Sequence, residues 1–98
     1  CVRCNGHIDR PIRRVAVCGG AGAFLIPQAI GSGADAFVTG EIGYHRFFGS
    51  DGEILLLEIG HYESEQFTVE LLSSVLRDRF PALRILHTSL KTNPIRYF

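Results

Sequence analysis

The chain has 98 residues, of which 46% are hydrophobic and 20% charged, and its basic and acidic side chains cancel to a formal net charge of zero. This size gives one small domain with a modest core and is too short for two. The composition excludes a disordered segment, no apolar run approaches the roughly 18–20 residues of a membrane helix, and the neutral charge gives no support for binding to nucleic acid or an anionic membrane.

Short apolar runs alternate with segments of helical spacing along the chain. After an irregular or weakly extended start over residues 1–13, the pattern predicts strands at 15–18, 36–39, 54–59 and 83–88. It predicts helical segments at 23–30, at 44–48 as a short helix or turn, and at 63–79. The alternation indicates an α/β layered fold, with a small, mostly parallel sheet flanked by helices.

The start of the chain indicates its origin. It begins with Cys1 rather than methionine and carries no signal-peptide pattern, so we expect a fragment of a longer, cytoplasmic protein. The loops after the first three predicted strands open on one edge of a parallel sheet, where α/β folds place their ligands. We therefore expect the functional residues to gather at that edge.

A glycine-rich turn follows the first predicted strand, with glycines at positions 19, 20 and 22. The backbone N–H groups of Gly19, Gly20 and Gly22 could hold a phosphate or another anion. In a second interpretation the glycines only permit a tight turn and close packing. The spacing is not that of a dinucleotide-binding motif, although Glu41 could take the place of the ribose-binding acid in one.

His61 and Glu65 lie where the third predicted strand passes into a helix. Residues four apart share one helical face, roughly 5–6 Å apart at Cβ, so this pair can bind a divalent metal. In a second interpretation Glu63 and Glu65 complement the helix dipole and His61 caps the helix. Catalytic zinc usually takes three protein ligands, so a metal site here is partial.

Glu41 and His45 form a second pair, with a carboxylate just past a strand and an imidazole one helical turn later. They are candidates for catalytic roles, and His45 has the alternative of a hydrogen-bonded residue in a turn.

The cysteines form a third group of candidate ligands. Cys1 and Cys4 could form half a zinc site with His7 and Cys18, but that spacing fits no common ligand pattern, so we interpret the thiols as incidental.

Four motifs in series, at residues 15–22, 39–45, 60–65 and 92–94, resemble the carboxyl-terminal half of the GTP cyclohydrolase 1 type 2 homologues, also called the Nif-three-like family. The resemblance covers about residues 12–95. It implies that residues 12–98 are the carboxyl-terminal α/β domain and that residues 1–11 are a junction from a preceding lobe or inserted domain.

The resemblance also implies a two-halved protein with two divalent metal ions, zinc, iron or manganese, between its halves. The family's carboxyl-terminal histidine and glutamate ligands fall on His61 and Glu65. The amino-terminal half supplies two adjacent histidines and an aspartate, so the centre is expected to be incomplete or empty in this fragment. Glu41, which is Asp in many members, and His45 match a motif lining the same cleft, where they support the ligands or contact substrate.

The expected function of the intact protein is that of a metal-dependent hydrolase, with the fragment itself inactive. His45 would orient or protonate substrate, and the glycine turn would hold the anionic group of a small phosphate-containing or nucleotide ligand. The expected partners are the missing amino-terminal half and further copies of the protein, since family members tend to form hexameric rings. The alternatives are a non-enzymatic metal-binding scaffold or regulatory module, and a nucleotide-binding α/β domain.

Overall fold

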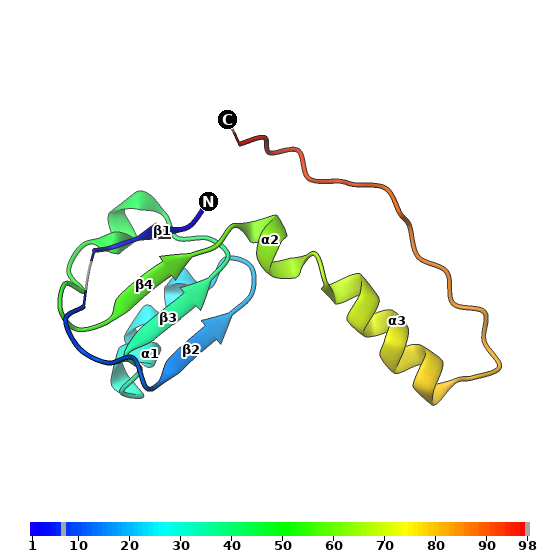
Figure 1. Ribbon diagram of the computed structural model, residues 1–98, viewed down its shortest axis with the longest axis horizontal. Helices are drawn as coiled ribbons and strands as arrows, with labels where there is room; N and C mark the ends of the chain where they lie inside the picture. The colour runs from blue at the N-terminus through cyan, green and yellow to red at the C-terminus, as the bar shows by residue number, and fades with distance from the viewer. Residues whose placement is uncertain (7, 98) are drawn as a thin grey trace. The chain divides into compact units, whose positions relative to one another are not determined.

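The computed structural model describes residues 1–6 and 8–97 and divides the chain into two compact units, Cys1–Glu65 and Gln66–Phe98. The first unit holds a four-stranded sheet in the order β1-β4-β3-β2 (Figure 1). Its strands are β1 (Arg3–Cys4), β2 (Val15–Cys18), β3 (Ala36–Thr39) and β4 (Leu55–Glu58). β2, β3 and β4 run parallel and β1 is antiparallel to β4, so the predicted α/β fold with a mostly parallel sheet is confirmed.

One face of this sheet carries the hydrophobic core. A 3₁₀ helix, η1 (Ala23–Leu25), leads into α1 (Ile26–Gly31), whose first turn contains Pro27, a residue that fits there because its missing N–H has no partner in that turn. A second 3₁₀ helix, η2 (Tyr44–Phe47), follows β3. Buried apolar residues from α1, β3, β4 and the residues that flank these strands form one cluster: Ile26, Ala29, Ala34, Phe37, Ile42, Ile54 and Leu56.

The short strand β1 is held to β4 by side chains as well as by its ladder. Asn5 donates to the Ile54 carbonyl oxygen and accepts from the Leu56 N–H, at 3.1 and 2.9 Å. The Arg3 guanidinium pairs with Glu58 and donates to the Ile42 carbonyl oxygen. A segment expected to be irregular or weakly extended therefore adds the antiparallel edge of the sheet.

Asp35, directly before β3, fastens the entrance of β2. One carboxylate oxygen accepts the backbone N–H groups of Arg13 and Arg14, each at 2.9 Å, and the other pairs with the Arg10 guanidinium. The two backbone hydrogen bonds are the main cause that lowers the pKa of Asp35 to about 2. The backbone of Arg13 and Arg14 and the side chain of Arg10 thus join the entrance of β2 to the residue before β3.

Asp35→Asn is expected to remove part of the acid sensitivity of the first unit. The folded pKa of about 2 lies below the ordinary aspartate value of about 3.9, so the ionised carboxylate stabilises the fold above pH 4 and this contribution is lost as the pH falls toward 2. Urea midpoints measured at pH 5 and pH 2 should differ less in the variant than in the wild type. Asp51→Asn, at an exposed turn residue, is the control, and an equal pH dependence in wild type and Asp35→Asn would contradict the assignment.

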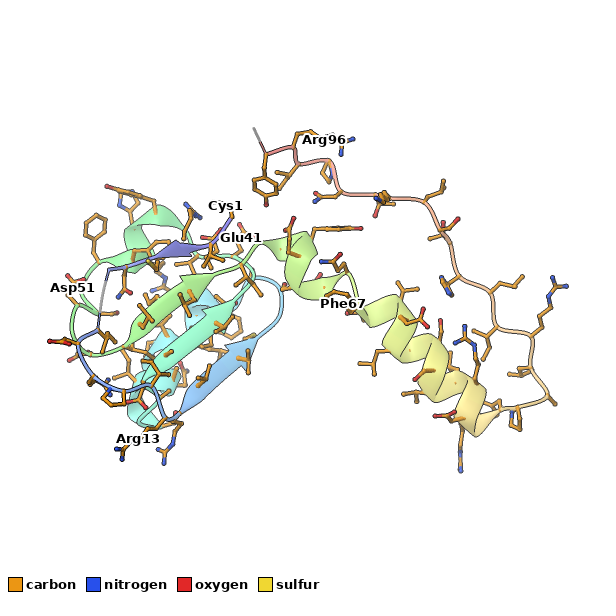
Figure 2. All side chains as sticks on the ribbon, in the orientation of Figure 1. Cys1, Arg13, Glu41, Asp51, Phe67 and Arg96 are labelled. Carbon is orange, nitrogen blue, oxygen red and sulfur yellow. The ribbon has the colours of Figure 1, made fainter. Side chains whose placement is uncertain are left out.

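The helical run predicted over 63–79 is divided in the structure. α2 (His61–Glu65) begins two residues earlier than predicted, and α3 (Thr68–Arg79) follows Phe67, which Figure 2 labels at the passage into α3. The division has a physical reason, because Ser64 holds α2 to the glycine turn while α3 belongs to the second unit. Neither these helices nor any other in the described part of the chain has the length and apolar character needed to cross a bilayer.

The strand predicted at 83–88 is wrong. After α3 the described chain, up to residue 97, forms no strand or helix, and the apolar side chains of Leu83 and Leu86 are exposed. A strand needs a neighbouring backbone to accept its hydrogen bonds, and among the described residues none pairs with residues 83–88. The apolar run alone does not supply a partner.

Candidate metal centre

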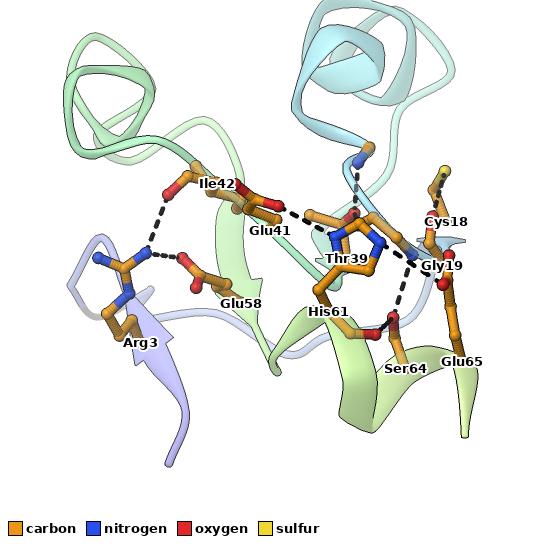
Figure 3. A network of polar contacts seen from close by, with 12 residues as sticks. Arg3, Cys18, Gly19, Thr39, Glu41, Ile42, Glu58, His61, Ser64 and Glu65 are labelled. Carbon is orange, nitrogen blue, oxygen red and sulfur yellow. Dashed lines mark hydrogen bonds and ion pairs between the residues drawn. The ribbon is translucent and has the colours of Figure 1, made fainter. Parts of the chain in front are cut away.

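The carboxyl ends of β2, β3 and β4 bring three segments together, as the parallel sheet requires. The glycine turn follows β2, Gly40 and Glu41 follow β3, and Gly60 and α2 follow β4. Figure 3 shows the imidazole of His61 standing between the side chains of Glu41 and Glu65 at this edge.

The two ring nitrogens of His61 face different carboxylates. Nδ1 lies 3.0 Å from Oε2 of Glu41, within hydrogen-bond distance. Nε2 lies 3.5 Å from Oε2 of Glu65, which is an ion-pair distance and too long for a good hydrogen bond. The two pairings are therefore unequal, and Glu41 holds the ring.

All three side chains are about half exposed, with 48% of His61, 59% of Glu41 and 52% of Glu65 open to solvent. The hydrogen bond to Glu41 is the main cause that raises the pKa of His61, and the charges of both carboxylates act in the same direction against partial burial. The two carboxylates therefore make this ring easier to protonate than a histidine free in solution.

The glycine turn is fastened to α2 and β3 by its own backbone groups. The Gly20 N–H donates to Ser64 Oγ at 3.0 Å, and Ser64 Oγ in turn donates to the His61 carbonyl oxygen at 2.8 Å. The Gly20 carbonyl oxygen accepts from the buried Thr39 hydroxyl and from the Glu41 N–H. Gly20 thus joins the turn to the segments that carry both His61 and Glu41.

Gly20 also forms a wall of the site. Its φ of +63° lies in the left-handed region, and a Cβ built there would stand 2.5 Å from Glu65 Oε1 and 3.6 Å from His61 Nε2. Gly40 is equally constrained, because a Cβ there would stand 2.5 Å from Ser64 Oγ. Gly20 thus gives room for the His61 and Glu65 side chains, and Gly40 for Ser64 and the glycine turn.

The structure supports the packing interpretation of the turn. The N–H of Gly20 is bonded to Ser64, and that of Gly22 donates to Thr39 Oγ1 at 2.9 Å. Helix α1 is also short and preceded by η1, so it offers little dipole. The anion site at Gly19, Gly20 and Gly22 stays a prediction; the N–H groups of Gly20 and Gly22 already have protein partners, and Glu41 is paired with His61.

His45 lies apart from this cluster. Its ring packs edge-on against Tyr44, with centroids 5.3 Å apart, and it lines a pocket of about 270 Å³ with Arg46, Phe48 and residues of α1. No hydrogen bond or ion pair joins His45 to Glu41, His61 or Glu65 in the described ranges. Its catalytic role stays a prediction.

The thiols do not add ligands. Cys1, Cys4 and Cys18 are free, and Cys18 donates to the adjacent Gly19 carbonyl oxygen. His7, the other residue of the partial zinc pattern, lies outside the described residues. Over residues 1–6 and 8–97, no three histidine, cysteine or acidic side chains are arranged to hold a metal ion.

The chain matches a known protein family along nearly its whole length. The family model of Duf34/NIF3 (NGG1p interacting factor 3) matches residues 1–94, nearly the whole chain. The chain belongs to the NIF3 family. A GTP cyclohydrolase 1 type 2 homolog of Streptococcus pneumoniae is 38% identical over 95 residues, which are 92% of this chain and 36% of that protein.

Solved NIF3 relatives share the fold. The crystal structure of Staphylococcus aureus protein SA1388 superposes with a TM-score of 0.88 at 32% identity, over 100% of this chain and 34% of that one. A Bacillus cereus protein related to NIF3 gives a TM-score of 0.71 at 29% identity, over 99% and 28%. The chain therefore spans about a third of the length of the NIF3 proteins that it matches.

Two residues that support this NIF3 site had no assigned role in the sequence. Ser64 and Thr39 bind the glycine turn from α2 and from β3, so they set where Gly20 lies beside Glu65. Both residues lie inside motifs that the sequence shows, because Thr39 precedes Gly40-Glu41 and Ser64 follows His61 by three residues. What the sequence did not show is that both hydroxyls meet the same glycine.

Proposed function

We propose that this chain supplies His61 and Glu65 as two ligands of a divalent metal centre in a longer NIF3 protein that acts as a metal-dependent hydrolase. The observation that carries the proposal is the 3.5 Å between His61 Nε2 and Glu65 Oε2. Bonds of about 2.1 Å at a tetrahedral angle separate two donor atoms by about 3.4 Å. The pair therefore fits two ligands of one ion.

The remaining ligands would come from outside this chain. Two protein donors are fewer than a catalytic zinc usually takes, and the described residues offer no third. The matched relatives are about three times as long as this chain. We therefore assign the missing donors to an amino-terminal half, in which the family resemblance implies a histidine pair and an aspartate that complete a centre of two zinc, iron or manganese ions.

Bound divalent ions polarise a phosphoryl or ring C=N bond and activate water for its hydrolysis. The residues of this chain orient and confine that centre. Glu41 holds the His61 ring, and Gly20 leaves the Glu65 carboxylate free to turn toward Nε2. The name GTP cyclohydrolase 1 type 2 homolog of the relatives suggests a nucleotide or another small phosphate-containing substrate.

The test is the metal content of the full-length protein after chelation and reloading with zinc, iron or manganese. His61→Ala and Glu65→Gln should each lose about one ion per subunit, because a ligand is removed. His87→Ala, at a histidine that pairs with Glu70 and is not one of the proposed ligands, should keep the wild-type content. An unchanged metal content in His61→Ala would refute the assignment.

Hydrolysis is tested separately, by screening the loaded protein against nucleotides and phosphoesters. Chelator-sensitive turnover that is lost in His61→Ala supports the hydrolase. This 98-residue chain alone should bind metal weakly and turn over nothing, so chelator-sensitive activity from it would contradict the proposal that further ligands are required.

One observation favours the second candidate, a metal-binding scaffold. α3 exposes most of its large apolar side chains, a feature of surfaces that bind other protein segments: Val69, Leu71, Leu72, Val75 and Leu76. If the protein is a metal-binding scaffold, His61→Ala should disrupt its assembly, and the wild-type protein should turn over no substrate. The hexameric ring and the cytoplasmic location stay predictions in both cases.

A further inference from the structure

We infer that Glu41 is a positioning residue that fixes the tautomer of His61, keeping the proton on Nδ1 and leaving the Nε2 lone pair facing Glu65. The inference rests on the proposed function only for its consequence, which is metal affinity. Its structural basis is the unequal pairing of the two ring nitrogens.

A neutral imidazole carries one N–H, and its partners decide which nitrogen keeps it. Glu41 Oε2 lies 3.0 Å from Nδ1, inside the usual 2.7–3.2 Å range of an N–H···O hydrogen bond, whereas Glu65 Oε2 lies 3.5 Å from Nε2, outside it. In the neutral ring Nδ1 therefore keeps the proton and donates it in a hydrogen bond to Glu41. The lone pair then points at the side where Glu65 and Gly20 stand.

Glu41 is placed for this role by the turn at the end of β3. Its backbone N–H donates to the Gly20 carbonyl oxygen at 3.0 Å, and the next residue, Ile42, is fully buried in the core. Its side chain is 59% exposed, with His61 as the partner of its carboxylate in the described part of the molecule. Substitution should therefore spare the fold, and its effect should appear at the ring.

The same pairing has a consequence for the metal. A histidine ligand usually donates its other N–H to a carboxylate or carbonyl, which fixes the ring and raises its basicity, and loss of such a partner typically costs 10–100-fold in metal affinity. Glu41 supplies that partner from the segment after β3, while His61 and Glu65 both come from α2. The metal-facing nitrogen is thereby set before a metal arrives.

The first experiment reads the tautomer directly in this chain, without metal. Ring ¹⁵N shifts of His61, recorded at the alkaline end of its titration curve so that the ring is neutral, should report Nδ1–H in the wild type. Glu41→Ala should shift the population toward Nε2–H, because Glu65 is then the only carboxylate beside the ring. Glu41→Gln should restore Nδ1–H, since the amide oxygen still accepts, and Glu65→Ala should leave it unchanged.

Nδ1–H retained in Glu41→Ala would overturn the inference. If Glu41→Ala acted only by disturbing the fold, Glu41→Gln would not restore Nδ1–H. The disturbance would also be visible in the amide region of the NMR spectrum. The second experiment measures zinc affinity of the full-length protein, where Glu41→Ala should weaken binding by about 10–100-fold. If His61→Ala leaves metal binding intact, the proposed function fails while the tautomer result stands, so the two are separable.

Discussion

Gly20→Ala is expected to weaken metal binding by the full-length NIF3 protein by about 10–100-fold while the fold survives. The new Cβ would stand 2.5 Å from Glu65 Oε1, the far end of a flexible side chain. The carboxylate can swing away at little cost to folding, and it then leaves His61 Nε2. Zinc titration and the urea midpoint, measured on the same variant, separate the two effects.

The control for Gly20→Ala is Gly52→Ala. Gly52 has a φ of +77°, close to the +63° of Gly20, but its Cβ would meet nothing within 4 Å. Both variants should therefore lose about 1–2 kcal/mol from the left-handed backbone, and only the first should lose metal affinity. Equal zinc affinity in the two variants would show that Gly20 is not a wall of the site.

Phe37→Ala is expected to destabilise the first unit by about 3–5 kcal/mol, a large share of the stability of a domain of this size. Phe37 is 1% exposed in the middle of β3 and packs against the apolar cluster beneath α1. Removing the ring leaves a cavity that a sheet paired on both sides of β3 cannot close. Urea denaturation followed by circular dichroism gives the free energy of unfolding.

Val17→Ala is the matched control for Phe37→Ala. Val17 lies in the neighbouring strand β2 and is 75% exposed, so its truncation should change the free energy of unfolding by less than about 0.5 kcal/mol. A similar loss in both variants would mean that the sheet face beneath α1 is not the core. Since β3 also carries Thr39 to the glycine turn, Phe37→Ala should loosen the site as it weakens the fold.

The local sequence pattern was sufficient to predict the three parallel strands of the sheet. The apolar runs at 15–18 and 36–39 became β2 and β3 with the predicted bounds, and the run at 54–59 became β4 within one residue at each end. Each run is short and rich in apolar side chains, a pattern that predicts a strand from the sequence alone. The four motifs in series likewise predicted the family that the comparison confirms.

The sequence did not show which segments find a partner strand. Residues 83–88 have the apolar character of a strand and form none, while the two residues of β1 form one because Asn5 and Arg3 reach groups of β4 and the segment before η2. Propensity describes a segment by itself, whereas a strand exists only where a second backbone is available.

For the site, the sequence by itself determined that His61 and Glu65 share one face at the start of a helix, because that spacing is a property of the helix alone. It took the folded chain to bring Glu41 and Gly20 beside them, and to place His45 in the lining of a pocket with residues of α1 instead. The contacts of Glu41 and Gly20 link residues about 20 to 45 positions apart. They depend on the order and register of β2, β3 and β4, which long-range packing sets and local periodicity does not encode.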